Sequence, residues 1–206
     1  MNRLTSSAIA LMLATTAAQA SLLPPGSPPS IPDNFPFPTG TLLASISGPY
    51  STGTISGTYA ESVVADPSNA LCSGCLDFLF SVTNNSNSLD NIARITHAPF
   101  TFSTTDVGYA TGTGSTFGTL PTTVDRLSAD TVGFSFGTGV APGSNTQTLE
   151  IQTNAPGFIP GHLQISDGSV TSVPVFAPVV PVPDVFWLLL SMVGGLGLFF
   201  VRRRAA

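Results

Sequence analysis

Short runs of alternating hydrophobic and polar residues occupy the middle of the chain. Four of them read TISGTYAESVV, LDFLFSVTN, TVGFSFG and TLEIQT, and each places its large apolar side chains on one face. Alternation with a period of two residues is typical of half-buried β-strands. The residues expected on the buried faces are Ile55, Tyr59, Val63, Phe78, Phe80, Val82, Phe134, Phe136, Leu149 and Ile151.

Turn-forming segments such as NNSNS, GTGS, APGSN and SDGS separate these runs. They are rich in Gly, Pro, Asn and Ser, which favour turns. The body shows no convincing amphipathic helix pattern, and 14 phenylalanines in the chain supply material for a core. We therefore predict an all-β fold of eight to ten strands over residues 41–172, arranged as an antiparallel β-sandwich or jelly roll.

Two proline-rich stretches flank this region. LLPPGSPPSIPDNFPFPT lies in residues 21–40, and VPVFAPVVPVP begins at Val173. Proline lacks an N–H donor and fixes φ, so neither stretch suits a helix or a central strand. Both are interpreted as extended linkers, the first over residues 21–40 and the second over residues 173–181.

The N-terminal residues 1–20 are typical of a secretory signal peptide. Arg3 precedes the apolar run AIALMLA, and the small residues AQA end at Ala20. This order of a positive start, an apolar segment and small residues is what signal peptidase requires. We predict cleavage between Ala20 and Ser21, and hence export from the cytoplasm.

The C-terminal stretch 185–201 has no charged residue and is followed at once by Arg202, Arg203 and Arg204. A helix of this length covers about 25 Å, close to the roughly 30 Å of a bilayer core. Trp187 near its start suits an interface, and the arginines favour the cytoplasmic side. The pattern predicts one transmembrane helix with the body outside and lacks the polar stripe of a soluble core helix.

Residues 182–206 resemble the PEP-CTERM sorting signal. The resemblance consists of Val182, Pro183 and Asp184, a glycine-containing hydrophobic helix and the final arginine cluster. Asp184 stands where the family usually has Glu, and Val185 where it has a second Pro. The resemblance implies export by a Gram-negative bacterium and recognition of the tail by an exosortase-type membrane enzyme. It covers only about 25 residues and leaves the body unassigned.

Charged residues make up 8% of the chain, and lysine is missing. The usual charged share is about 25%, so Thr, Ser, Gly and Pro supply the polarity here. Between Ser21 and Pro183, ten acidic side chains face only Arg94 and Arg126. This surface would repel phosphate backbones, so a nucleic-acid partner is not expected.

The only cysteines, Cys72 and Cys75, form a CSGC motif before a predicted strand. A redox C-x-x-C belongs at a helix N-terminus, and a zinc site needs two further ligands. His97 and His162 lie too far apart in sequence to complete a zinc finger. In an oxidising compartment the expected state is a structural disulfide, with metal and redox roles as alternatives.

Other candidate chemistry lacks supporting context. GFSFG matches the G-x-S-x-G elbow at Ser135, but no helix pattern follows it, and an esterase would need His162 and Glu150 nearby. Carboxylate pairs that suit a glycosidase are Asp125 with Asp130 and Asp77 with Asp90. The D-x-[DN]-x-[DN]-G calcium loop is missing, which leaves calcium in turns as an open alternative. We therefore expect no enzyme activity and no cofactor.

Three hypotheses for function follow. The first is a non-catalytic cell-surface or extracellular-matrix protein, anchored in the inner membrane with its body in the periplasm, then sorted and associated with exopolysaccharide. The second is a carbohydrate-binding or adhesin module, in which Tyr50, Tyr59 and Tyr109 would supply the aromatic contacts. The third is a secreted hydrolase built on Ser135 or on a carboxylate pair.

Overall fold

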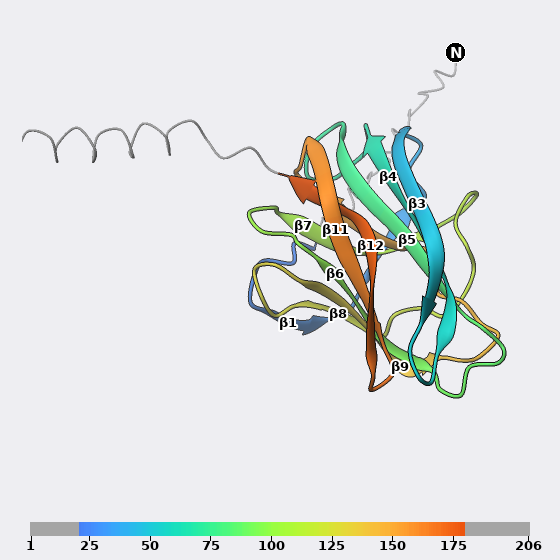
Figure 1. Ribbon diagram of the computed structural model, residues 1–206. Coiled ribbons are helices and arrows are strands. Elements are labelled where there is room, and N and C mark those ends of the chain that lie inside the picture. Colours follow the sequence, from blue (N-terminus) through green and yellow to red (C-terminus); the bar gives the residue numbers. More distant parts are fainter. Residues whose placement is uncertain (1–20, 180–206) are drawn as a thin grey trace, which may run out of the picture.

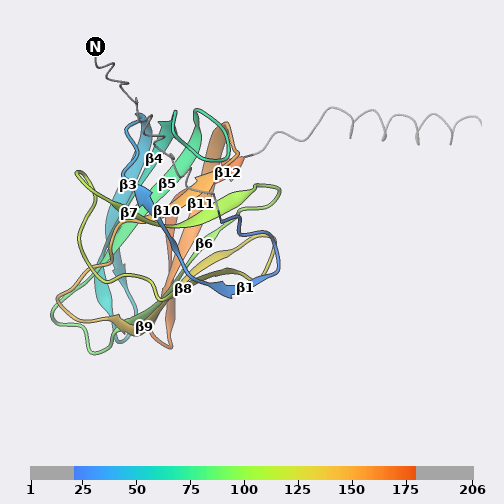
Figure 2. The ribbon, with the colours of Figure 1, turned by 180° about the vertical axis from the view of Figure 1, so that it is seen from behind.

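A computed structural model of the chain describes residues 21–179, and these residues form two facing six-stranded sheets. The β6 sheet contains, in spatial order, β1 (Ser27–Ser30), β8 (Thr123–Arg126), β9 (Val132–Val140), β6 (Ile92–Ala98), β11 (Gly157–Ser166) and β12 (Val170–Val179). The β5 sheet contains β2 (Asp33–Pro36), β7 (Thr105–Thr111), β10 (Leu149–Thr153), β5 (Cys75–Asn84), β4 (Ser56–Asp66) and β3 (Thr41–Ser51). Figures 1 and 2 show the two layers from opposite sides.

The predicted all-β sandwich is confirmed over the described residues, which contain no helix and therefore no helical membrane span. Neighbouring strands pair antiparallel with one exception, because β2 runs parallel to β7. Residues 21–179 also form twelve strands rather than eight to ten. The predicted signal peptide, sorting motif and helix 185–201 lie outside the described residues.

The core lies between the two sheets and follows the alternation in the sequence. All ten residues expected on buried faces belong to one cluster of buried side chains. Phe80 of β5 and Phe134 of β9 meet edge to face across the two layers, with ring centroids 5.3 Å apart. Burial of one such side chain contributes about 1.5–3 kcal/mol, so the phenylalanines are a major part of the stability of the sandwich.

The two proline-rich stretches are not linkers. Residues 21–40 contain β1 and β2, and residues 173–179 belong to β12, so the sandwich extends well beyond the predicted 41–172. The physical reason is position, because β1, β2 and β12 are all outermost strands. An outermost strand has N–H groups that need no partner, and proline tolerates that place.

Proline also protects these edges. The fourth outermost strand, β3, contains Pro49, and Pro160 of β11 lies before His162, where pairing with β6 starts. Proline on an exposed edge blocks pairing with another chain. The expectation that the two proline-rich stretches form no central strand is confirmed, although both contribute outermost strands of the sheets.

Candidate functional site

The predicted disulfide is present and joins Cys72 to Cys75. It closes a short loop between β4 and β5, where Gly74 adopts a positive φ of 81° that favours glycine. The side chain of Asn69 also holds the loop, because its Oδ1 accepts hydrogen bonds from the N–H groups of Leu71 and Cys72. A closed loop this small contributes roughly 2 kcal/mol in the chain-entropy model.

The structure does not bring the esterase candidates together. Ser135 lies in the middle of β9, which continues to Val140, so no helix follows the serine. His162 lies on β11, separated from β9 by β6, and Glu150 lies on the other sheet. The elbow geometry of a G-x-S-x-G nucleophile is therefore missing at Ser135.

The two members of each candidate carboxylate pair also differ in their partners or in their positions. Asp125 pairs with Arg94, whereas Asp130 accepts a hydrogen bond from the hydroxyl of Thr101. Asp77 is buried near the start of β5, whereas Asp90 is exposed in the loop beyond the end of that strand. Neither pair faces a common position where a sugar bond could lie.

The tyrosines do not form an exposed aromatic surface. Tyr50 and Tyr59 are each only 5% exposed and belong to the core. The Tyr50 hydroxyl donates to the backbone carbonyl of Thr83, and burial raises its pKa above the ordinary range. Tyr109 is half-buried on β7. The aromatic contacts expected for a sugar-binding role are therefore not supplied by Tyr50 and Tyr59.

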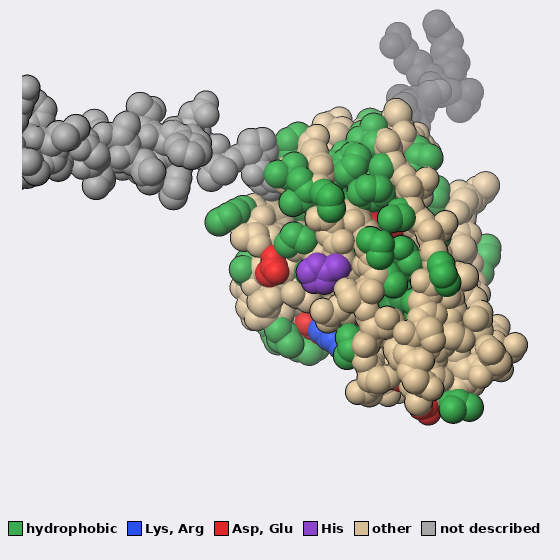
Figure 3. All heavy atoms as spheres, viewed as in Figure 1, with side chains coloured by type: hydrophobic (Ala, Val, Ile, Leu, Met, Phe, Trp, Pro, Cys, Tyr) green, Lys and Arg blue, Asp and Glu red, His purple; other side chains and the backbone are tan. Residues whose placement is uncertain are grey.

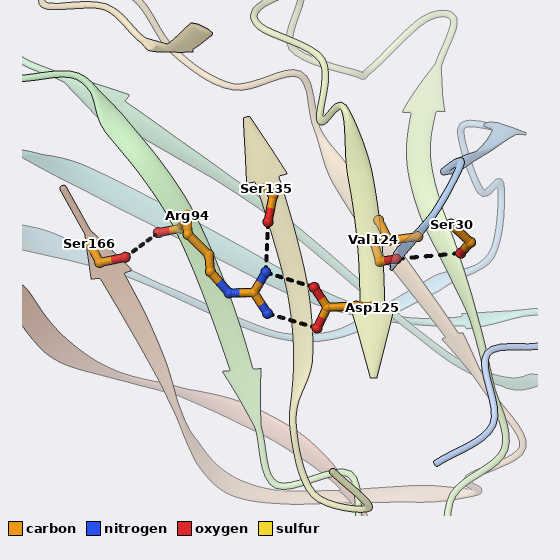
Figure 4. Close-up of polar contacts among 6 residues, drawn as sticks. All are labelled: Ser30, Arg94, Val124, Asp125, Ser135 and Ser166. Carbon is orange, nitrogen blue, oxygen red and sulfur yellow. Dashed lines mark hydrogen bonds and ion pairs between the residues drawn. The ribbon is translucent and has the colours of Figure 1, made fainter. Parts of the chain in front are cut away.

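An arginine on the outer face of the β6 sheet joins three strands (Figure 4). Arg94 of β6 donates through both terminal nitrogens to Asp125 of β8, at 2.7 Å each, and at 2.6 Å to the hydroxyl of Ser135. The guanidinium crosses β9 above Gly133, where a Cβ would lie 2.0 Å from Arg94 Nη2. This cluster ties β6, β8 and β9 together, and its charges are mutually satisfied.

The rest of that face is mainly uncharged. Figure 3 shows green hydrophobic side chains among tan backbone and uncharged polar side chains, with few charged atoms. His162 and Gln164 are exposed there on β11. This face offers hydrogen-bonding groups but no concentration of charge.

The interior of the sandwich contains a hydrogen-bonded carboxyl–imidazole pair that connects the sheets. Glu61 of β4 and His97 of β6 are buried, and Glu61 Oε1 lies 2.9 Å from His97 Nε2. Glu61 Oε2 accepts a hydrogen bond of 2.7 Å from the N–H of Phe176 on outermost strand β12. One carboxylate therefore satisfies two buried polar groups from the opposite sheet.

A second buried charge is the guanidinium of Arg126, at the end of β8. Its Nη2 donates to the carbonyls of Phe100 and Ala129 at 2.7 and 2.8 Å. Its Nη1 donates to the carbonyl of Ser103 at 2.9 Å and reaches the carbonyl of Leu23 at 3.4 Å. Burial lowers the pKa of this group from its ordinary value. Arg126 thereby fixes the N-terminal segment to two loops of the body.

The most unusual chemistry lies on the outer face of the β5 sheet, where five acidic side chains cross five neighbouring strands. We call this set the acid row; its members are Asp33 on β2, Asp106 on β7, Glu150 on β10, Asp77 on β5 and Asp66 at the end of β4. The register places Gln152 of β10 opposite both Asp106 and Asp77. The pairing of the strands therefore brings these carboxyls into one line.

Four members of the acid row are buried, although they face outward from their sheet. Asp77, Asp106 and Glu150 are fully buried, and Asp66 is 2% exposed. The loop with the disulfide covers part of the row, because Asn69 donates at 2.6 Å to Asp77 Oδ1. Three of the carboxyls have oxygens without a hydrogen-bond donor, namely Asp77 Oδ2, Glu150 Oε2 and both oxygens of Asp106.

Burial changes the protonation of the acid row. It raises the pKa of Asp77 to about 9, and the charges of Glu150 and Asp66 add to this effect. Burial also raises the pKa of Glu150 to about 8, against a hydrogen bond from Gln152. For Asp106, burial and the neighbouring Asp33 carboxyl raise the pKa to about 7. The row therefore holds protons near neutral pH.

Metal-binding geometry is missing from the part of the chain that the structure describes, in which no group of three or more His, Cys, Asp or Glu side chains is arranged to hold an ion. The sequence placed Asp77 and Glu150 on outward faces through their alternation with core residues. It gave no sign that the disulfide loop and the N-terminal segment fold over them, because that cover depends on contacts distant in sequence.

A groove of about 360 Å³ lies on the same outer face as the acid row. Phe37, Val64 and Leu79 give it an apolar side, and hydroxyl groups from Ser62 and Thr148 also line it. Such a mixture of a ring face and hydroxyls suits a small amphiphilic ligand.

Comparison of the chain with family models, curated proteins and solved structures found no match.

Proposed function

We propose that this protein is an exported, non-catalytic component of the cell surface or extracellular matrix. The observation that carries the proposal is the disulfide between Cys72 and Cys75 in a lysine-free β-sandwich. Disulfides persist in oxidising compartments outside the cytoplasm. The proline-protected outermost strands support the same interpretation, because they suit a domain that must stay separate in a crowded envelope.

In this proposal, signal peptidase cleaves after Ala20 and the C-terminal helix holds the protein in the inner membrane with its body in the periplasm. An exosortase-type enzyme then recognises Val182, Pro183 and Asp184 and transfers or releases the body, which associates with exopolysaccharide. β12 ends at Val179, so only residues 180 and 181 separate the last described strand from this motif. The sorting enzyme would therefore act close to the sandwich.

Intact-mass spectrometry of the protein recovered from its native cell tests the proposal. We expect a chain that begins at Ser21, ends near Asp184 and has lost 2 Da through the disulfide, a loss that reduction reverses. Deletion of the sorting enzyme should lengthen the chain through Ala206 and move it to the membrane fraction. A mature protein that retains residues 1–20, or one that retains the tail on the cell surface, would contradict it.

A second candidate function is binding of a saccharide, and the groove lined by Phe37 favours it. Sugars combine apolar ring faces with hydroxyls, and the lining of the groove contains both the Phe37 ring and the hydroxyls of Ser62 and Thr148. A glycan array with and without calcium measures this directly. We expect signals that Phe37→Ala abolishes and that Asp90→Asn, on an exposed loop, leaves unchanged; an array without signals refutes the candidate.

A further inference from the structure

The first residues of the described chain are already attached to the acid row. The backbone nitrogen of Ser21 lies 3.1 Å from Asp33 Oδ2. Leu22 forms an antiparallel bridge with Asp106, and the N–H of Leu23 donates at 2.8 Å to the carbonyl of Thr105. Ser21 therefore stands where β2 and β7 bring two carboxyls together.

These two carboxyls have no cationic partner among the described side chains. Asp106 is fully buried without a donor to either oxygen, and the half-buried Asp33 lies beside it. Residues 21–179 contain two arginines. Arg94 is paired with Asp125, and Arg126 donates to backbone carbonyls and to the Thr105 hydroxyl. A buried carboxyl in this state needs either a proton or a cation.

We propose that the α-ammonium group released at Ser21 by cleavage after Ala20 is the counter-ion of Asp33 and Asp106. The inference rests on the cleavage site in the proposed function. Hydrolysis adds water across the Ala20–Ser21 peptide bond, so the carbonyl carbon of Ala20 becomes a carboxylate. The nitrogen of Ser21 leaves as an amine, which takes up a proton. A neutral amide with one N–H thus becomes a cation with three donors, at the same atom.

Removal of the leader therefore alters the electrostatics of the folded domain. In the uncleaved chain, burial and then the neighbouring Asp33 carboxyl raise the pKa of Asp106 to about 7. After cleavage the ammonium faces Asp33 from β2 and Asp106 from β7, with Glu150 of β10 further along the row. An adjacent opposite charge lowers the pKa of the carboxyl and raises that of the amine. The new ion pair locks the segment that carries outermost strands β1 and β2 onto the body.

The composition of the chain makes the test selective. The sequence has no lysine, so the α-amine at Ser21 is the only primary amine of the mature chain. A full-length mature chain, residues 21–206 in detergent, can be released from a removable N-terminal tag so that it starts at Ser21. Reductive methylation with ¹³C-formaldehyde labels that amine and keeps its charge, whereas acetylation removes the charge.

We expect the ¹³C-methyl signal of the labelled amine to titrate about one pH unit above that of the same chain in urea, which corresponds to a tenfold stronger hold on the proton. Asp33→Asn and Asp106→Asn should each reduce this difference, and Asp90→Asn, on an exposed loop, should not. Acetylation should lower the urea midpoint of folding, and methylation should leave it nearly unchanged.

A chain with one glycine added before Ser21 is the matched control, because it displaces the amine by about 3.5 Å while keeping every native residue. The amine of the folded glycine-extended chain should have the same pKa as the amine of that chain in urea. Three results would overturn the proposal. The amine could have the same pKa in the folded and unfolded chains, its raised pKa could survive both Asp33→Asn and Asp106→Asn, or the glycine-extended chain could show the same rise. The engineered chain starts at Ser21 whether or not the native cell cleaves there, so the titration tests the ion pair independently of the mass measurement on the native protein. If the native protein is cleaved at another position, the ion pair can still form in the engineered chain but has no role in the cell.

Discussion

Replacement of Glu61 by leucine tests whether the buried pair of Glu61 and His97 stabilises the sandwich. Leucine has a similar size but removes both acceptors, so His97 Nε2 and the Phe176 N–H lose their partners at 2.9 and 2.7 Å. His97 Nδ1 already has no hydrogen bond, and the imidazole would then have none among the described residues. Removal of one member of a buried pair costs about 3–5 kcal/mol.

The free energy of unfolding of residues 21–179, measured by urea denaturation, should fall by that amount in Glu61→Leu. For a domain of this size the melting temperature should fall by about 6–20 °C, at roughly 2–4 °C per kcal/mol. Glu61→Gln keeps an acceptor for Phe176 and a polar contact to His97, so we expect a smaller loss of about 1–2 kcal/mol. Asp90→Asn, exposed and outside the pair, should change stability by less than about 0.5 kcal/mol.

The double variant Glu61→Leu with His97→Leu shows whether Glu61 and His97 stabilise the fold through their interaction or independently of each other. Replacement of both partners by apolar groups removes the uncompensated polar atoms of the imidazole, so the double variant should be more stable than the sum of the single losses predicts. A Glu61→Leu loss below about 1 kcal/mol, or strictly additive losses in the cycle, would refute the pairing as the source of stability.

Three further predictions concern other charged groups. Burial raises the pKa of Asp77 to about 9 and of Glu150 to about 8, so the folded domain binds protons that the unfolded chain releases. Stability measured by urea denaturation should therefore fall as the pH rises from about 4 to 9, and combined Asp77→Asn and Glu150→Gln should flatten this profile. Arg126→Met leaves several buried carbonyls without donors and should cost about 3 kcal/mol, with faster hydrogen exchange at the N-terminal segment. Gly133→Ala places a Cβ 2.0 Å from Arg94 Nη2 and should break the partly buried ion pair with Asp125, for a loss of about 1.5–3 kcal/mol in urea denaturation.

The alternation of residues was sufficient to predict the core. Every apolar residue assigned to a buried face lies in the core cluster, because a period of two fixes the side of a strand regardless of its neighbours. Glu61 has the same phase as Tyr59 and Val63, so the pattern already placed a carboxylate inward. Its partner His97 has the phase of Ile95, but only the pairing of the two sheets brings the two side chains together.

The proline-rich stretches were misinterpreted because local sequence does not distinguish an outermost strand from a linker. Both are extended and both tolerate a residue without an N–H. The difference lies in whether a partner strand is available, and β8, β7 and β11 provide one for β1, β2 and β12 respectively. That information comes from residues 100 or so positions away for β1, which no local window contains.

The burial of the acid row also could not be predicted from local sequence. Alternation in LDFLFSVTN and TLEIQT directs Asp77 and Glu150 away from the core, and an outward carboxylate would ordinarily be solvated. Here the disulfide loop and the segment after Ser21 cover it, so the outer face becomes a second interior with raised pKa values. The segment that closes this interior starts at the predicted cleavage site. Leu22 and its bridge partner Asp106 are far apart in the sequence, which is why local alternation could not reveal that these outward carboxyls are buried.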